Sequence, residues 1–170
     1  MGQERIRPMA ERAGKAAGTL GFFVRRVRSA DVPHVAALDA RITGIAKPAY
    51  WQDIFERYGR RRLPQRQFLI AEPEVADERF PILGFIIGEV RAWEFGSAPC
   101  GWVFALSVEP KARQRGIGHA LLETIVRDFK AVGVTKMRTM VARDNRLHLS
   151  FFRGEGMMAG PYLQLEKDLD

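Results

Sequence analysis

The stretch Val108-Glu109-Pro110-Lys111-Ala112-Arg113-Gln114-Arg115-Gly116-Ile117-Gly118 decides the fold of this chain. The run before it, from Trp102 to Val108, is apolar in the manner of a β-strand. The residues after it, from Gly116 to Ala131, carry apolar side chains at helical spacing. The sequence therefore predicts a strand, a short turn and a helix in this order.

The predicted turn has features that suit a phosphate ligand. The first backbone N–H groups of a helix have no partner within the helix and carry partial positive charge, so they bind anions. Arg113 and Arg115 add positive charge, and Gly116 and Gly118 let a ligand approach the backbone closely. A pyrophosphate is the natural ligand for this arrangement.

The same residues resemble the acetyl-CoA motif of the GNAT superfamily of N-acetyltransferases. That motif reads Arg/Gln-x-x-Gly-x-Gly/Ala and follows a strand that ends in Val-x-Pro. Arg113, Gly116 and Gly118 fill the motif here, and Val108 and Pro110 precede it at the expected distance. The resemblance implies an enzyme that binds acetyl-CoA at this turn and uses it as the acetyl donor.

The rest of the chain agrees with the order of elements in that family. We predict strands over 22–28, 67–72, 82–91, 102–108, 136–142 and 161–167, and helices over 33–42, 49–61, 116–131 and 145–152. Strands joined by short turns should be antiparallel, and the two strands that flank the central helix should be parallel. The expected fold class is α+β (mixed α/β): a GNAT fold with a central, mostly antiparallel mixed sheet, one parallel pair and helices on both faces.

Length and composition indicate one soluble globular domain, since the chain has 170 residues of which 46% are hydrophobic and 28% are charged. Residues 1–20 are basic and lack the apolar segment of a secretory signal, so we expect a disordered tail there and a single domain over 21–170. The single cysteine, Cys100, agrees with a reducing compartment, and no apolar run is long enough to span a bilayer. We expect a cytoplasmic protein.

The net charge of +7 is unevenly distributed. Residues 1–66 contain 14 Lys and Arg against 6 Asp and Glu, whereas the remaining residues contain 13 against 14. The cluster Arg60 to Arg62 could attract an anion such as CoA or contact nucleic acid. We favour a solvated helix end, where cations oppose the helix dipole.

The resemblance also implies roles for residues beyond the motif. In a GNAT fold, the strand that ends at Val108 separates from the strand 136–142, and the pantetheine arm pairs with main-chain groups of the first strand. The pyrophosphate lies on the backbone N–H groups of the turn. The expected cofactor-binding residues are Leu106, Ser107, Val108, Arg113, Gln114, Arg115, Gly116, Ile117, Gly118, His119, Asn145 and Phe152.

A second family motif, Asn-x-x-Ala-x-x-x-Tyr, starts at Asn145 but is only partly matched. His148 stands at the Ala position and Phe152 at the Tyr position. The family tyrosine is assigned to protonating the departing CoA sulfur, and phenylalanine has no proton to give. A thiol with a pKa of about 8.5 can leave as a thiolate, so the missing acid need not abolish transfer. Ser150, Tyr162 and water are alternative proton donors.

An acceptor ammonium must lose a proton before it attacks a thioester. Glu89, on the strand 82–91, is the first candidate for this base, ahead of Glu109 and His148. The alternative is that Glu89 only pairs with a neighbouring cation such as Arg91. The three histidines lack ligand spacing, so we expect no metal.

The leading interpretation is an acetyl-CoA-dependent N-acetyltransferase that acts on a primary amine of a small molecule or a protein by direct nucleophilic attack. By analogy with the family, Tyr50 and Trp51 are candidates for lining the acceptor pocket. The alternatives are a different acyl-CoA donor and a non-catalytic acyl-CoA-binding module, which Phe152 favours. Nucleic-acid binding is the least favoured partner, and we expect no membrane partner. Family members often form dimers, so a homodimer through the last strand is one candidate assembly.

Overall fold

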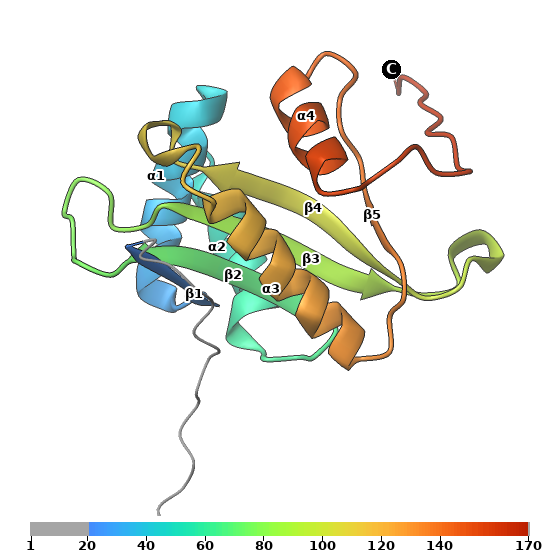
Figure 1. The fold of residues 1–170 in the computed structure, drawn as a ribbon, viewed down its shortest axis with the longest axis horizontal. Coiled ribbons are helices and arrows are strands. Elements are labelled where there is room, and N and C mark those ends of the chain that lie inside the picture. The colour runs from blue at the N-terminus through green and yellow to red at the C-terminus, as the bar shows by residue number, and fades with distance from the viewer. Residues whose placement is uncertain (1–20, 170) are drawn as a thin grey trace, which may run out of the picture.

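The computed structural model describes residues 21–169 as a five-stranded sheet with helices on both faces (Figure 1). The predicted tail, residues 1–20, lies outside the described residues. The strands are β1 (Phe22–Arg26), β2 (Arg66–Pro73), β3 (Gly84–Arg91), β4 (Cys100–Val108) and β5 (Met137–Thr139). The helices are α1 (Val32–Thr43), α2 (Pro48–Ile54), α3 (Ile117–Ala131) and α4 (Arg146–Gly154).

The strands lie in the sheet in the same order as in the chain, β1-β2-β3-β4-β5. Neighbouring strands from β1 to β4 are antiparallel, whereas β4 and β5 are parallel. The connection between β4 and β5 contains α3. The expected mixed sheet, with its parallel pair on either side of the central helix, is therefore confirmed.

Alternation along the strands sends side chains to two separate cores. On β2, Leu69 and Ala71 pack in the cluster that includes α3, whereas Phe68 and Ile70 pack in the cluster that includes α1 and α2. Figure 1 shows α3 in front of the sheet and α1 and α2 behind it. Because both faces of the central strands are covered, these strands are apolar on both sides.

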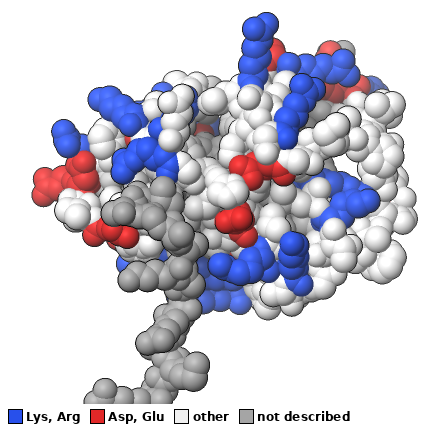
Figure 2. Space-filling view, in the orientation of Figure 1, with Lys and Arg blue, Asp and Glu red and all other residues white. Residues whose placement is uncertain are grey.

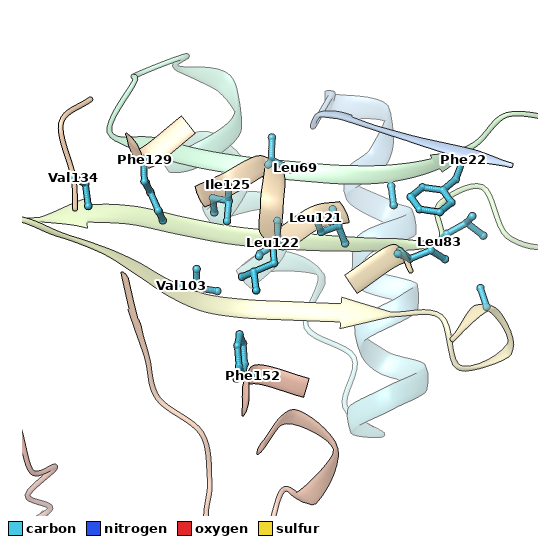
Figure 3. Close-up of a cluster of buried hydrophobic side chains, with 14 residues drawn as sticks. Phe22, Leu69, Leu83, Val103, Leu121, Leu122, Ile125, Phe129, Val134 and Phe152 are labelled. Carbon is cyan, nitrogen blue, oxygen red and sulfur yellow. The ribbon is translucent and has the colours of Figure 1, made fainter. Parts of the chain in front are cut away.

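The helix α3 covers the front of the sheet with one apolar stripe. Leu121, Leu122, Ile125 and Phe129 are buried at helical spacing and point toward the strands (Figure 3). The stripe holds the helix along the sheet, so that its N-terminus lies beside the end of β4. In Figure 3, Phe152 of α4 belongs to the same cluster but lies apart from the stripe of α3.

The strands β4 and β5 separate soon after they meet. Their pairing ends at Val103 and Thr139. On the other side of β4, Ile87 faces Ala105 while Gly88 faces Val103, so Phe104 is the extra residue of a β-bulge. Beyond Val103, the edge of β4 that faces β5 has no strand partner within residues 21–169.

Several predicted elements differ from the structure. The strand expected over 161–167 is wrong: this segment pairs with no strand, and Leu163 and Leu165 are almost fully exposed. The strand expected over 136–142 is reduced to β5. The helix expected over 49–61 is α-helical only as α2 and continues as a π-helical segment, Phe55–Arg60. The other elements lie where they were expected, with shifted ends. No helix within residues 21–169 is long and apolar enough to cross a membrane.

Candidate functional site

A cleft of about 560 Å³ lies where the end of β4, the start of α3 and the helix α4 meet. Most of the predicted cofactor-binding residues line this cleft. They are Leu106, Ser107, Val108, Arg113, Gln114, Gly116, Ile117, Gly118, His119 and Asn145. The structure thus brings together residues that are up to about forty positions apart in the sequence, because β4, which precedes α3, and β5, which precedes α4, are neighbours in the sheet.

The start of α3 forms the end of the cleft that suits a phosphate. Gln114 and Gly116 both have left-handed backbone conformations, with φ of 62° and 76°. Such turns group backbone N–H groups on one concave side, and this favours an anion. A Cβ atom on Gly118 would lie 3.0 Å from the ring of Phe151, so any side chain there would narrow the cleft. The residues present therefore fit a pyrophosphate.

An ion pair joins the two walls of the cleft at this end. The Nδ1 atom of His119, in the first turn of α3, lies 2.9 Å from Oε2 of Glu155, which follows α4. Its Nε2 atom lies 3.5 Å from Glu123. The hydrogen bond with Glu155 is the main reason why the pKa of His119 is raised above its ordinary value. Both His119 and Glu155 line the cleft.

A smaller slot of about 110 Å³ lies between β4 and β5, where the strands separate. Leu106, Asn145 and His148 line both the slot and the main cleft. Asn145 caps α4, since its Oδ1 atom accepts a hydrogen bond from the backbone N–H of His148 at 3.1 Å. Phe152 lines the slot as a buried apolar wall, with its ring centre 6.3 Å from that of His148.

Glu89 lies outside both cavities. Its carboxylate accepts hydrogen bonds from the Tyr58 hydroxyl at 3.0 Å and from Nε of Arg91 at 3.1 Å. Burial and the hydrogen bond to Glu89 raise the pKa of Tyr58. The Tyr58 ring packs edge-on against Phe104, the bulge residue, which lines the slot. Tyr58 thus lies between Glu89 and the slot, and no pattern in the sequence distinguished it from the other aromatic residues of its helix.

Glu109, one of the two lower-ranked candidate bases, is buried and paired with Arg41 at 2.8 Å. Of the two candidate acceptor-pocket residues, Trp51 is buried in the core and donates a hydrogen bond to Asp39, whereas Tyr50 is 45% exposed. Neither lines the main cleft or the slot. The two candidate acceptor-pocket residues therefore lie outside the cavities that the cofactor-binding residues line.

Some residues of the cleft were missed by the sequence analysis, and one predicted residue lies elsewhere. Ile42, Leu147, Phe151 and Glu155 line the cleft, but nothing in their local sequence pattern indicates a ligand. Arg115 instead lines a separate hollow beside Lys111 and Phe80. The direction in which a side chain leaves a turn depends on the backbone angles there, and the sequence motif alone does not give these angles.

The surface around the site carries charges of both signs. On the face shown in Figure 2, Lys and Arg side chains gather in several places with Asp and Glu between them. Within residues 21–169, no group of three or more His, Cys, Asp or Glu side chains is placed to hold a metal ion. Cys100 is buried, with Nη1 of Arg138 3.4 Å from its sulfur.

Several solved structures with the same fold are aminoglycoside acetyltransferases. An aminoglycoside N-acetyltransferase in complex with CoA matches with a TM-score of 0.71 and 16% identity, over 86% of this chain and 94% of its own. The aminoglycoside 6'-N-acetyltransferase of Acinetobacter baumannii matches with a TM-score of 0.70 and 15% identity, over 88% of this chain and 100% of its own. At such identities the likeness concerns the fold.

Sequence relatives point to the same family. The amino-acid acetyltransferase of Neisseria meningitidis serogroup A is 28% identical over 116 residues, which are 67% of this chain and 23% of that enzyme. The mycothiol acetyltransferase of Kocuria rhizophila is 28% identical over 104 residues, 61% of this chain and 34% of that enzyme. The chain thus spans about a quarter to a third of the length of these relatives. The sequence model of the acetyltransferase (GNAT) family matches residues 35–157, so the chain belongs to this family, as its central motif predicted.

Proposed function

We propose that this protein is an acetyl-CoA-dependent N-acetyltransferase that acetylates a primary amine of a small molecule or a protein by direct attack on the thioester. One observation carries the proposal: a continuous lining connects the anion-binding start of α3 with the slot between β4 and β5. A phosphate group at one end and a reactive thioester at the other require such a connected path. Residues 21–170 form its single catalytic domain in this proposal.

Different residues of the chain bind different parts of the cofactor in this proposal. The backbone N–H groups from Gln114 to His119, with Arg113, hold the pyrophosphate. The unpaired edge of β4 from Leu106 to Val108 offers main-chain groups to an extended amide-bearing arm, as an edge strand does to a peptide. Asn145 closes the path from the side of α4. Acetyl-CoA, when bound, supplies the activated acetyl group.

Glu89 is the proposed base of the reaction. A carboxylate near the acceptor can take the proton that the attacking amine loses, directly or through a water molecule. The hydrogen bond from Tyr58 holds the Glu89 carboxylate beside the residues that line the slot. The names of similar proteins mention aminoglycosides, amino acids and mycothiol, so a panel of amines from these classes is the natural screen.

Thermal unfolding with and without acetyl-CoA tests the binding part of the proposal. A ligand that binds only the folded state stabilises it by about 2.7 kcal/mol at a hundredfold excess over Kd. We expect a clear rise of Tm with acetyl-CoA and with CoA, followed by amine-dependent release of CoA. Binding without release for any amine would favour the non-catalytic module, and no rise at millimolar ligand would reject the cofactor site.

We further propose a cytoplasmic protein without nucleic-acid partners and, as one candidate assembly, a homodimer. On the face shown in Figure 2, Asp and Glu side chains lie between the Lys and Arg side chains, which disfavours nucleic-acid binding on that face, since such a surface is a basic patch or stripe. Sedimentation at several protein concentrations measures the assembly. Retention on a DNA column at physiological salt would contradict the proposal.

A further inference from the structure

The imidazole of His148 stands where the main cleft opens into the slot between β4 and β5. Its ring lines both cavities, together with Leu106 and Asn145. Its Nε2 atom lies 3.2 Å from the carbonyl oxygen of Leu106 on β4. The side chain therefore reaches from α4 across to β4, and a thin arm that extends from the start of α3 into the slot passes beside it.

Asn145 fixes the tautomer of this ring. Its Oδ1 atom accepts the backbone N–H of His148, which leaves Nδ2 as the amide donor. Nδ2 lies 2.7 Å from Nδ1 of His148, so Nδ1 must accept a hydrogen bond. The neutral ring then carries its proton on Nε2 and donates it to the Leu106 carbonyl oxygen. This assignment follows from the hydrogen-bonding pattern.

A donor at this place supplies what Phe152 cannot. Phe152 occupies the position of the family tyrosine and is part of the buried apolar wall. A neutral imidazole N–H is too weak an acid to give its proton to a thiolate. It can still donate a hydrogen bond to a developing negative charge, and a donor already oriented in a site of low polarity stabilises such charge strongly.

We propose that the Nε2–H group of His148 is the hydrogen-bond donor to the sulfur of the thioester as it leaves, and that Asn145 is the residue that positions it. When the arm is bound, one of its amide N–H groups replaces the imidazole at the carbonyl oxygen of Leu106, and this frees Nε2–H for the sulfur. The inference rests on the proposed acetyltransferase function. As the amine nitrogen bonds to the carbonyl carbon, the C–S bond breaks and its electron pair goes to sulfur. His148 holds the resulting thiolate by a hydrogen bond. The proton lost by the amine goes to Glu89 or to water, and solvent later protonates the thiolate.

The test is the pKa of the thiol of bound CoA, measured by the ultraviolet absorbance of the thiolate as the pH is raised. With the native protein, we expect this pKa to lie at least about one unit below that of free CoA, because a hydrogen bond to the charged form favours it. His148→Ala, which restores the small residue of the family motif, should remove most of this shift. His148→Gln should keep much of it, since an amide donates a hydrogen bond but cannot ionise.

Asn145→Asp provides a matched test of the tautomer. The carboxylate keeps an oxygen that can cap α4, but it accepts a hydrogen bond from Nδ1–H, whereas the amide donated a hydrogen bond to Nδ1. At a pH where imidazole is neutral, the ring then presents the lone pair of Nε2 to the sulfur. We expect the shift in thiol pKa to be lost or reversed in this variant, although its helix content and unfolding curve stay close to those of the native protein.

Calorimetric titration with CoA on the same variants distinguishes a failure of CoA binding from a failure of the proposed role of His148. Native protein that does not bind CoA would overturn both the proposed function and this role of His148. Binding with a thiol pKa that is the same in native protein, His148→Ala and Asn145→Asp would overturn only the role of His148. If His148→Ala fails to fold, the comparison of Asn145→Asp with native protein decides.

Discussion

Arg41 of α1 and Glu109, which directly follows β4, form an ion pair with 2.8 Å between Nη2 and Oε2. The Glu109 carboxylate is buried, whereas the Arg41 side chain is 45% exposed. The pair joins the helix behind the sheet to the turn that precedes α3. Ile42, next to Arg41, lines the cleft, so the same contact also fixes one margin of the candidate site.

Replacing Arg41 by alanine should leave a buried carboxylate without its partner. We expect the free energy of unfolding to fall by about 1–3 kcal/mol, toward the lower end because Arg41 is partly exposed to water. Urea denaturation measures the change. The double variant Arg41→Ala with Glu109→Gln should recover part of the loss, and a double variant no more stable than the single one would contradict this account.

A negative charge at the start of α3 should weaken the binding of CoA. Gly116→Asp and Gly116→Asn have nearly the same shape, and both side chains tolerate the left-handed backbone that Gly116 adopts. They differ only in charge. We expect Gly116→Asp to bind CoA at least about tenfold more weakly than Gly116→Asn, a difference of about 1.4 kcal/mol. Equal affinities in calorimetry would place the phosphates elsewhere.

The pair between His119 and Glu155 should make stability depend on pH. Because the pKa of His119 is raised in the folded state, the pair stabilises the fold fully below about pH 6.5, the ordinary imidazole value, and loses this effect as the pH rises through the raised pKa. The effect should stay within about 1 kcal/mol, since the His119 side chain is 55% exposed.

Thermal unfolding of native protein and Glu155→Gln checks this expectation. The native protein should exceed the variant in Tm at about pH 5.5, and the difference should shrink at about pH 8.5, since the imidazole loses its proton as the pH rises. A difference that is the same at both values would mean that Glu155 stabilises the fold without its ion pair.

Glu89→Gln should slow acetyl transfer without weakening the binding of CoA. Loss of a positioned base lowers kcat by about a hundredfold or more, whereas the cofactor site does not include Glu89. Steady-state kinetics and calorimetry measure the two effects separately. The control is Tyr58→Phe, which removes the hydroxyl that donates to Glu89 but keeps the carboxylate, and which should lower kcat less. Unchanged kcat in Glu89→Gln would assign the proton transfer to another group or to water.

The elements around the central motif could be predicted because their signals are local. The apolar periodicity of α3, the cap at Asn145 and the left-handed glycine after α3, Gly133, each depend on residues close in the sequence. The cofactor side of the site followed from the same motif, since a strand and the helix after it bring their adjoining ends together.

The prediction of a strand over 161–167 failed because pairing of a strand is not a local property. Residues 161–167 alternate between apolar and polar side chains as a strand does, but a strand also requires a partner with free backbone groups. In the structure this segment contacts β5 through side chains, with the guanidinium of Arg138 4.4 Å from the ring centre of Tyr162. Alternation reports which side chains could share a face, and pairing depends on the tertiary structure.

The hydrogen-bond partners of the polar residues in the site could not be predicted from the sequence either. His148 was visible in the sequence as a departure from the family motif, but only the structure connects it with Leu106, 42 positions earlier. Glu89 was expected near the reaction centre, but that Tyr58 lies between its carboxylate and the slot is visible only in the structure. Which hydrogen bonds a side chain makes is decided by distant parts of the chain, so a pattern of residue types does not contain it.

The short pairing of β5 has a consequence for how a ligand reaches the site. One wall of the cleft belongs to the continuous sheet and to α3, whereas α4 follows a strand of only three residues. Segments held by few backbone hydrogen bonds open locally at low free energy. We therefore expect amide hydrogens of α4 to exchange with solvent faster than those of α3, and a ligand that touches both walls to slow them. The rate of entry would then follow the opening of α4.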